Sequence, residues 1–305
     1  MLGLAGLLGA LLAGSFVIAN NNDEPDEALD YDDRDDEDAP NTAGNTNILL
    51  DDSGAVQGGP GGDLLHGDEE DDQIAGHGGD DWIDGGFGDD HLTGGEGDDE
   101  LHGGRGDDRL AGDAGNDALY GHNDDDFLSG GMGDDVLVGG DGDDWLNGGD
   151  GDDQLQGSAG DDALQGGLGQ DSLQGGSGND ALTGVVPDAD GIDLDGQDYL
   201  NGGAGNDTIA LGTGDIASGG TGADTFALGD WIDVESGAQI MDFNPDEDTL
   251  VLIYDDSEGD EPEVSVEPDA DDPDTANVLV DGQVLASVLN APGLTAGQIS
   301  LVAER

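Results

Sequence analysis

The sequence predicts an all-β fold: a right-handed parallel β-roll, in which two nine-residue repeats form each coil, followed by a small antiparallel β-cap. Three observations support this prediction. Glycine and aspartate recur with a nine-residue period over residues 58–183, an aliphatic residue occupies the same place in every period, and alternating apolar runs replace the glycines after residue 228. Repeats this short cannot bury a core alone, so they must stack on one another.

The repeating unit is G-G-x-G-x-D-x-U-x, where U is aliphatic, and fourteen units follow one another without a break from Gly58. Position six is Asp and position eight is Leu or Ile in every unit, while position four is Gly except at Glu70 and Asp124. The x-U-x stretch predicts a three-residue strand with its aliphatic side chain inward. The other six residues predict a turn, because glycine reaches positive φ without penalty. With two units per coil, residues eighteen apart stack at about 4.8 Å.

The composition excludes several classes of function. The 305 residues include 75 acidic side chains but only four Arg, with no Lys and no Cys, and the formal net charge is −71. Such a chain repels nucleic acid, which proteins bind through Lys and Arg. Without Lys there is no Walker-type nucleotide site and no Schiff-base chemistry, and without Cys there are no disulfides or thiolate metal sites. No combination of nucleophile, base and orienting group is apparent, so we expect no enzyme activity.

The aspartates at position six indicate calcium. Stacking places Asp81 about 5 Å from Asp99, and rows of carboxylates this close repel one another unless a cation lies between them. The turns offer only hard oxygen ligands, namely carboxylates and the carbonyls of the glycine turns, and this is the set that Ca²⁺ prefers. One aliphatic residue in nine also makes a thin core. We therefore expect roughly a dozen Ca²⁺ ions and folding that depends on them.

The predicted ligands fall into two groups. The predicted side-chain ligands are Asp63, Asp72, Asp81, Asp90, Asp99, Asp108, Asp117, Asp126, Asp135, Asp144, Asp153, Asp162, Asp171, Asp180, Asp198, Asp207 and Asp224. The predicted backbone carbonyl region comprises Gly86, Gly88, Gly95, Gly97, Gly104, Gly106, Gly131, Gly133, Gly140, Gly142, Gly149 and Gly151.

The repeat resembles the calcium-binding nonapeptide of RTX, or haemolysin-type, proteins over roughly residues 48–227. The resemblance implies a bacterial protein that is secreted or displayed at the cell surface, with type I secretion machinery as its export partner. The segment GGTGADTFALGDW…IMDFNPDEDTL is similar to the region that follows the repeats in serralysin-type secreted proteins. In those proteins the chain end carries the secretion signal, which implies this role for residues 297–305.

The segments before the repeats are of a different kind. Residues 1–19 are apolar, and two interpretations remain open: a signal peptide, with Val17 and Ala19 at a small-residue cleavage site but no basic start, or an uncleaved anchor. Only the anchor would contact a membrane. Residues 20–47 predict an acidic, disordered linker. Residues 48–57 keep a degenerate register, with Val56 at the aliphatic position, and predict a cap for the roll.

Beyond residue 183 the motif weakens. Residues 184–192 and 193–201 keep the nine-residue length but few motif residues, and we expect a surface bulge. A separate Ca²⁺ site in the stretch DADGIDLDGQD is the alternative, although this stretch lacks the Glu that completes an EF-hand loop. The motif shortens by one residue at 211–218. Six apolar runs and a hairpin signal at Asp281-Gly282 predict the antiparallel β-cap within residues 228–305.

Other side chains give weaker signals. The five histidines (His66, His77, His91, His102 and His122) have no ligand spacing, so we expect exposed surface residues. Phe127 and Trp145 are eighteen residues apart at outward position seven and predict a stacked pair that could bind a sugar ring or a protein. The acidic residues at position five, from Asp71 to Asp161, are expected to face solvent without a primary role as ligands.

The function predicted from these features is calcium binding by the repeats, with Ca²⁺-induced folding of an extracellular protein. Two alternatives remain open. The roll could be the rigid stalk of a surface adhesin or glycan-binding module, or the accessory domain of a secreted hydrolase. The 57 residues before the repeats are too few and too acidic for a catalytic domain, which disfavours the hydrolase.

Overall fold

The computed structural model describes residues 47–49, 55–187, 193, 195–229, 231–232, 236–255 and 261–304. The predicted apolar segment (1–19) and nearly all of the predicted linker (20–46) lie outside these residues, so both remain predictions. Among the residues that the structure describes, no helix is long and apolar enough to cross a membrane.

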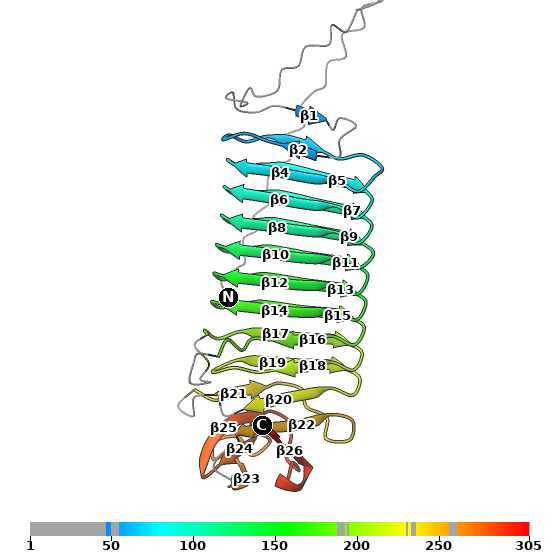
Figure 1. Cartoon of the computed structure of the whole chain (residues 1–305). Coiled ribbons are helices and arrows are strands. Elements are labelled where there is room, and N and C mark those ends of the chain that lie inside the picture. Colours follow the sequence, from blue (N-terminus) through cyan, green and yellow to red (C-terminus); the bar gives the residue numbers. More distant parts are fainter. Residues whose placement is uncertain are drawn as a thin grey trace, which may run out of the picture. The chain divides into compact units, whose positions relative to one another are not determined.

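A parallel β-solenoid of about nine turns occupies most of the described chain, as Figure 1 shows. Successive strands of the roll alternate between two sheets. The odd-numbered strands and β24 form a 14-stranded sheet, and the other even-numbered strands form a 12-stranded sheet. Leu128 on β10 (Phe127–Met132) pairs with Leu146 on β12 (Trp145–Asp150), eighteen residues later, and the pairing is parallel. The predicted fold class and the two repeats per coil are therefore confirmed.

The strands have the following bounds. The odd-numbered strands of the roll are β1 (Asn47–Leu49), β3 (Leu64–His66), β5 (Trp82–Phe87), β7 (Glu100–Arg105), β9 (Ala118–Asn123), β11 (Val136–Asp141), β13 (Gln154–Ala159), β15 (Ser172–Ser177), β17 (Tyr199–Ala204) and β19 (Ile216–Thr221). The remaining even-numbered strands of the roll are β2 (Ala55–Gln57), β4 (Gln73–Gly78), β6 (His91–Glu96), β8 (Arg109–Ala114), β14 (Ala163–Leu168), β16 (Ala181–Thr183), β18 (Thr208–Ala210) and β20 (Thr225–Gly229).

Most of these strands are twice as long as predicted. β5 covers positions seven to nine of one unit and positions one to three of the next. Gly86 pairs with Gly104, and the N–H of Gly88 donates to the carbonyl oxygen of Arg105 at 2.9 Å, so the backbone ladder continues through the glycines. The prediction of a three-residue strand and a six-residue turn was therefore wrong, because glycine here extends the ladder instead of ending it.

The core is a double column of aliphatic side chains, one from each strand. Every residue at position eight, from Leu65 to Leu182, is at most 2 % exposed. Val56 is also buried and pairs with Ile74, as its predicted aliphatic position requires. Residues 50–54 lie outside the described residues, so the role of residues 48–57 as a cap remains a prediction. Each aliphatic side chain packs on its counterparts in the neighbouring coils, so the burial is continuous along the roll.

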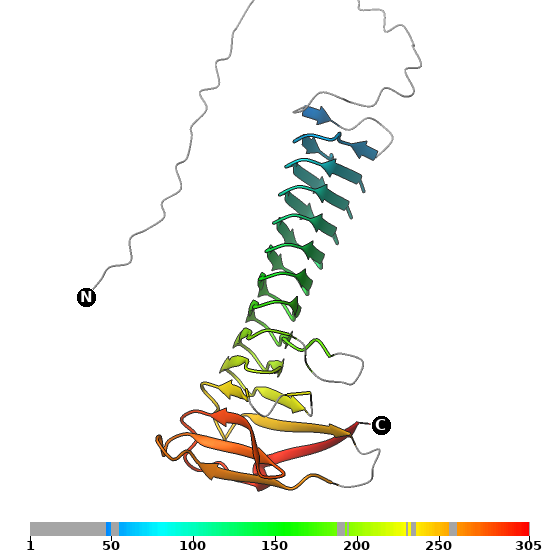
Figure 2. The ribbon, with the colours of Figure 1, turned by 90° about the vertical axis from the view of Figure 1, so that its left-hand side faces the viewer.

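The regular spacing is interrupted at two places. Leu173 pairs with Leu200, 27 residues later, so nine additional residues between β16 and β17 add no rung. Figure 2 shows the described chain leaving the stack of strands there. Residues 188–192 and 194 lie outside the described residues, so the expected surface bulge remains a prediction. Leu200 then pairs with Ala217, 17 residues later, at the predicted one-residue shortening.

The C-terminal cap is only partly antiparallel. β23 (Val264–Pro268), β24 (Ala276–Val280) and β25 (Gln283–Val288) pair antiparallel, and Asp281 and Gly282 form the hairpin turn with φ of 51° and 81°. The predicted antiparallel cap is confirmed for these three strands, while the parallel pairing of the solenoid continues further than expected. Three further strands pair in parallel: β21 (Ala238–Ile240) with β19, β22 (Thr249–Asp255) with β20, and β26 (Ile299–Glu304) with β22. A 3₁₀ turn, η1 (Ala296–Gln298), precedes β26.

Candidate calcium sites

The aspartates at position six form a buried ladder that runs through the roll. All of the predicted side-chain ligands, from Asp63 to Asp224, are at most 5 % exposed. The backbone N–H of each one donates to Oδ1 of the corresponding Asp in the next coil, at 2.8 Å from Asp81 to Asp99. These bonds fix the register of the turns, because the side chain of one coil satisfies the backbone of another.

The ladder also includes two residues that the sequence analysis missed. The N–H of Asp198 donates to Oδ1 of Asp215 at 2.9 Å, and that of Asp224 to Oδ1 of Asp248 at 3.0 Å. Asp215 lies in the shortened unit and Asp248 lies beyond the repeats. Both nevertheless stand two residues before a buried apolar residue, Ala217 and Leu250 respectively, as every Asp at position six does.

The second oxygen of most of these carboxylates has no protein partner. Among the ladder residues, Oδ2 is buried and accepts no hydrogen bond in Asp81, Asp90, Asp99, Asp108, Asp117, Asp126, Asp135, Asp144, Asp153, Asp162, Asp171, Asp180, Asp198 and Asp207. Near the start of the roll, by contrast, the N–H of Asp68 donates to Oδ2 of Asp72 at 2.9 Å. Burying a carboxylate oxygen without a partner is costly, so a cation or a proton at these positions would stabilise the regular coils.

In the fourteen regular units, each Oδ2 points towards the glycine at position one of its own turn. A methyl group added at Gly85 would meet Oδ2 of Asp90, and also the carbonyl oxygen of Gly103 in the next coil at 2.8 Å. Carboxylate and carbonyl oxygens from neighbouring coils therefore lie beside the same Cα atom. This is a set of hard oxygen donors, the kind that Ca²⁺ prefers, and it leaves no room for a side chain.

The twelve predicted carbonyl-region glycines, at positions two and four, all have positive φ, for example 108° at Gly86 and 110° at Gly88. This conformation favours glycine for steric reasons alone. Their role as ligands remains a prediction. The carbonyls at position one, such as that of Gly103, lie beside the same Cα atom as an Oδ2 and were not predicted.

Burial changes the acid–base behaviour of the ladder. It raises the pKa of Asp90 to about 7 and that of Asp126 to about 8. The backbone N–H bonds oppose this shift, and the neighbouring ladder carboxylates reinforce it. A cation therefore competes with protons for these oxygens near neutral pH.

The acidic residues at position five form a second ladder on the surface. The N–H of Asp107 donates to Oδ1 of Asp89 at 3.0 Å, and the N–H of Asp89 donates to Oδ1 of Asp71 at 3.0 Å. The bonds run in the direction opposite to those of the buried ladder. All three side chains are exposed, as predicted, but their hydrogen bonds between coils were not foreseen.

A family model for the RTX calcium-binding nonapeptide repeat matches residues 57–92, 93–128, 129–164, 156–184 and 192–215. The chain belongs to the RTX calcium-binding repeat family. RTX repeats bind Ca²⁺ through a β-roll, and the buried Asp ladder fits that ion. The repeats themselves are structural and not catalytic.

Two solved structures illustrate what the RTX roll resembles. One is a subunit of the mannuronan C5-epimerase from Azotobacter vinelandii, with 26% identity and a TM-score of 0.27 over 50% of this chain and 79% of that chain. The other is an extracellular lipase from Serratia marcescens, with 18% identity and a TM-score of 0.21 over 83% of this chain and 41% of the lipase. No curated protein matches the chain.

Of the five histidines, His77, His91 and His122 are exposed as expected, but the search for ligand spacing missed one contact between two histidines. On the RTX roll, Nδ1 of His102 lies 3.0 Å from Nε2 of His122, and Nε2 of His102 lies 3.0 Å from Oε1 of Glu100. His102 also stacks on Tyr120, with ring centroids 4.9 Å apart. His122 follows Tyr120 by two residues and shares its face because the strand continues through position two. Both ring nitrogens of His102 therefore have a hydrogen-bond partner, Nε2 on Glu100 and Nδ1 on His122.

The predicted stacking of Phe127 and Trp145 is confirmed, with ring centroids 4.2 Å apart and an angle of 11° between the rings. Phe127 is 43% exposed. Trp145 also lines a groove of about 270 Å³, which continues over the small side chains of Ala163, Ala181 and Thr208. The RTX roll therefore carries a flat aromatic platform next to a shallow groove.

Proposed function

We propose that this RTX chain is a calcium-dependent folding module without catalytic activity of its own, in which Ca²⁺ binding between coils converts an acidic chain into the roll. The row of buried Oδ2 atoms without a protein partner carries this proposal. In the absence of cations, the folded state must hold these carboxylates close together and away from water. The unfolded chain leaves them solvated and apart, so calcium-free conditions favour unfolding.

The ligand set favours Ca²⁺ over other metals. The ladder offers carboxylate and carbonyl oxygens, and the described histidines take no part in it. Ca²⁺ accepts six to eight oxygens in irregular geometry, whereas Mg²⁺ requires a near-ideal octahedron and retains more water. Ions bound between two coils stabilise both, so we expect cooperative binding of roughly a dozen ions.

We further propose that the chain folds outside the bacterial cell after export through type I secretion machinery. Extracellular modules bind Ca²⁺ at about 10⁻⁴ to 10⁻³ M, so such sites fill in millimolar Ca²⁺ but stay empty at cytosolic concentrations. The candidate secretion signal, residues 297–305, supports this order of events. Its described residues include most of β26, which pairs with β22 along the last coil. The signal is therefore accessible to the export machinery before folding, and it is paired with β22 afterwards.

Circular dichroism of the full chain in EGTA, in millimolar Ca²⁺ and in millimolar Mg²⁺ tests the folding proposal. We expect a disordered spectrum in EGTA and in Mg²⁺, and a β-rich spectrum in Ca²⁺ that chelation reverses. A β-rich spectrum that EGTA leaves unchanged would refute the proposal. For export, equal secretion rates at micromolar and millimolar external Ca²⁺ would count against folding as part of the process.

The aromatic platform favours a second function, binding of a surface glycan or a protein by the folded roll. Stacked, exposed rings beside a shallow groove suit the apolar face of a sugar. Glycan-array binding by the Ca²⁺-loaded chain tests this candidate. Trp145→Ala should abolish binding, whereas Trp82→Ala, on the other sheet, should not. Absence of binding by the unsubstituted chain would end this proposal.

A further inference from the structure

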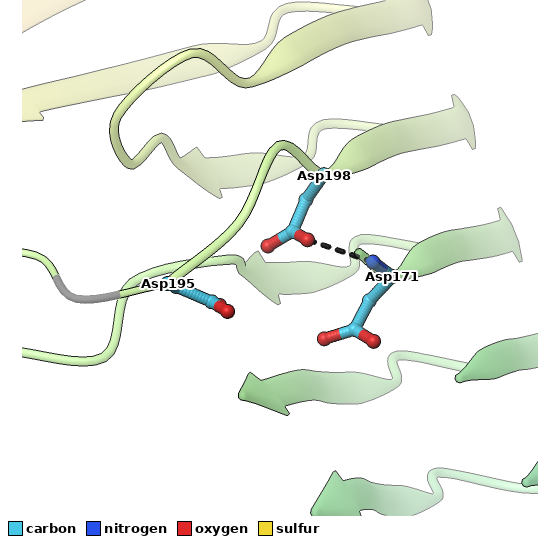
Figure 3. Close-up of side chains that lie close together, drawn as sticks. All are labelled: Asp171, Asp195 and Asp198. Atoms are coloured by element: carbon cyan, nitrogen blue, oxygen red, sulfur yellow. Dashed lines mark hydrogen bonds between the residues drawn. The ribbon is translucent and has the colours of Figure 1, made fainter. Parts of the chain in front are cut away.

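Three carboxylates meet where the nine additional residues enter the roll, as Figure 3 shows. Asp171 precedes β15 and Asp198 precedes β17, so these two belong to the buried ladder. Asp195 comes from the segment between β16 and β17. One oxygen from each of the three carboxylates lies within 4.8 Å of the others. The regular coils place no carboxylate at the position of Asp195, because residues at position three, such as Asp141, are exposed.

A change in hydrogen bonding explains why Asp195 turns inward. In regular coils, the N–H of the glycine at position four donates to the backbone carbonyl of the residue at position three in the next coil. This bond is 2.8 Å from Gly151 to Leu168 and 2.9 Å from Gly160 to Ser177. At the irregular coil, the N–H of Gly169 donates instead to Oδ1 of Asp195 at 2.7 Å. A carboxylate thus replaces a neutral carbonyl, which adds one formal negative charge to this turn.

All three carboxylates also retain an oxygen without a partner. Asp171 and Asp198 are 0% exposed. The N–H of Asp171 donates to Oδ1 of Asp198 at 2.8 Å, and Gly169 and Gly196 both donate to Oδ1 of Asp195. Oδ2 of each of the three is buried and accepts no hydrogen bond. In Figure 3 the carboxyl groups face a common space.

We propose that Asp171, Asp195 and Asp198 form a three-carboxylate Ca²⁺ site that differs from the repeat sites and binds its ion more tightly. Two oxygens on opposite sides of a Ca²⁺ ion are at most about 5.2 Å apart, so a spacing within 4.8 Å fits one ion. Affinity for Ca²⁺ rises with the number of charged ligands. The ion also ties the inserted segment to two coils of the roll. This proposal rests on the proposed function, since it assumes that the ladder binds Ca²⁺.

The order in which ions leave the protein tests the site. The Ca²⁺-loaded full chain is mixed rapidly with an excess of a fluorescent chelator, and the amplitude of each phase gives the number of ions released per chain. We expect one ion to leave about tenfold more slowly than the rest, because its site carries a third carboxylate. Asp195→Asn should remove this slow phase, since Asn keeps an oxygen for the N–H of Gly169 but lacks the charge. The matched control is Asp141→Asn, at the same position of a regular unit, which should leave the slow phase intact.

The outcomes separate this site from the proposed function. Release of all ions in one phase from the unsubstituted chain overturns the proposal, as does a slow phase that persists in Asp195→Asn. In both cases a chain that still folds with Ca²⁺ leaves the proposed function standing. A chain that binds no Ca²⁺ overturns both. If Asp195→Asn fails to fold, the number of ions that the unsubstituted chain releases in the slow phase tests the site. One ion per chain supports the site, and the absence of a slowly released ion refutes it.

Discussion

The backbone N–H of Asp90 donates a hydrogen bond of 2.8 Å to Oδ1 of Asp108 in the next coil, while Oδ2 of both residues is buried without a protein partner. One oxygen of each carboxylate therefore fixes the stacking of the coils, and the other is left to a cation. Because this division recurs along the ladder, the stability of the roll and its occupancy by cations are linked.

The first prediction concerns pH in the absence of calcium. Burial raises the pKa of Asp81 to about 6, of Asp108 to about 7 and of Asp126 to about 8, above the ordinary value of 3.8 that we assign to the unfolded chain. A raised pKa in the folded state means that the protonated carboxyl stabilises the fold. This contribution is fully present below about pH 4 and is lost as the pH rises through 6 to 8. The calcium-free chain should therefore form the roll near pH 4 and lose it between pH 6 and 8.

Circular dichroism in EGTA from pH 3 to pH 9 measures this effect, with a parallel series in millimolar Ca²⁺ as the control. The Ca²⁺ series should stay β-rich through pH 8, because the ion replaces the protons. A calcium-free chain that gains structure as the pH rises would contradict the assignment of the buried carboxylates.

The second prediction concerns the charge of a single ladder residue. Asp108→Asn keeps an oxygen to accept the N–H of Asp90 but removes a buried negative charge. In Ca²⁺ the variant should lose roughly 1–3 kcal/mol of unfolding free energy, because ligands are lost from the neighbouring ions. In EGTA the sign should reverse, and the fold should persist to higher pH. The control is Asp107→Asn, whose side chain is exposed, and it should change neither result appreciably. Destabilisation of Asp108→Asn to the same extent in both conditions would indicate a purely structural carboxylate.

The third prediction compares two glycines of the repeats. A methyl group at Gly85 would meet Oδ2 of Asp90 and the backbone of Gly103, whereas one at Gly78 would meet only atoms of Glu96 at 3.7 Å and 3.8 Å. Gly85→Ala should cost about 1–3 kcal/mol in Ca²⁺ by overpacking, and it should raise the Ca²⁺ concentration needed for folding. Gly78→Ala should be neutral or slightly stabilising, because it reduces the freedom of the unfolded chain. Urea unfolding at fixed Ca²⁺ measures both, and equal losses would argue against a tight site at position one.

The regular part of the roll could be predicted because every unit repeats the same residue pattern. The aliphatic residue at position eight marks the side chain that points inward, and the Asp at position six marks the turn. The spacing of eighteen residues then determines which residues stack on one another. Strand length could not be predicted in this way, since glycine is a poor strand residue in isolation. At Gly86 and Gly104, the ladder between coils outweighs that local preference.

The irregular features depend on long-range geometry that the motif does not encode. Asp195 turns inward only because the additional residues displace a carbonyl that Gly169 would otherwise bond. The contact between His102 and His122 spans 20 residues, one coil plus two positions, so a search at multiples of nine misses it. Residues two apart on a strand share a face, so a search at a spacing of twenty residues, one coil plus two, would have found the contact.

The fourth prediction concerns backbone strain at position two. Ser158 has a φ of 93° and stacks between Gly140 and Gly176, both of which also have positive φ. A residue with a Cβ atom is strained in this conformation, and glycine is not, although glycine also gains freedom in the unfolded chain. Ser158→Gly should therefore stabilise the Ca²⁺-loaded roll by about 0.5–1 kcal/mol, despite losing the hydrogen bond from Gln156. The reciprocal change Gly140→Ser should be destabilising by more, because its Cβ would also meet the backbone carbonyl of His122. Thermal unfolding at a fixed Ca²⁺ concentration compares the two variants. If Ser158→Gly lowers the melting temperature as much as Gly140→Ser does, side-chain contacts and not φ determine the choice of residue at this position.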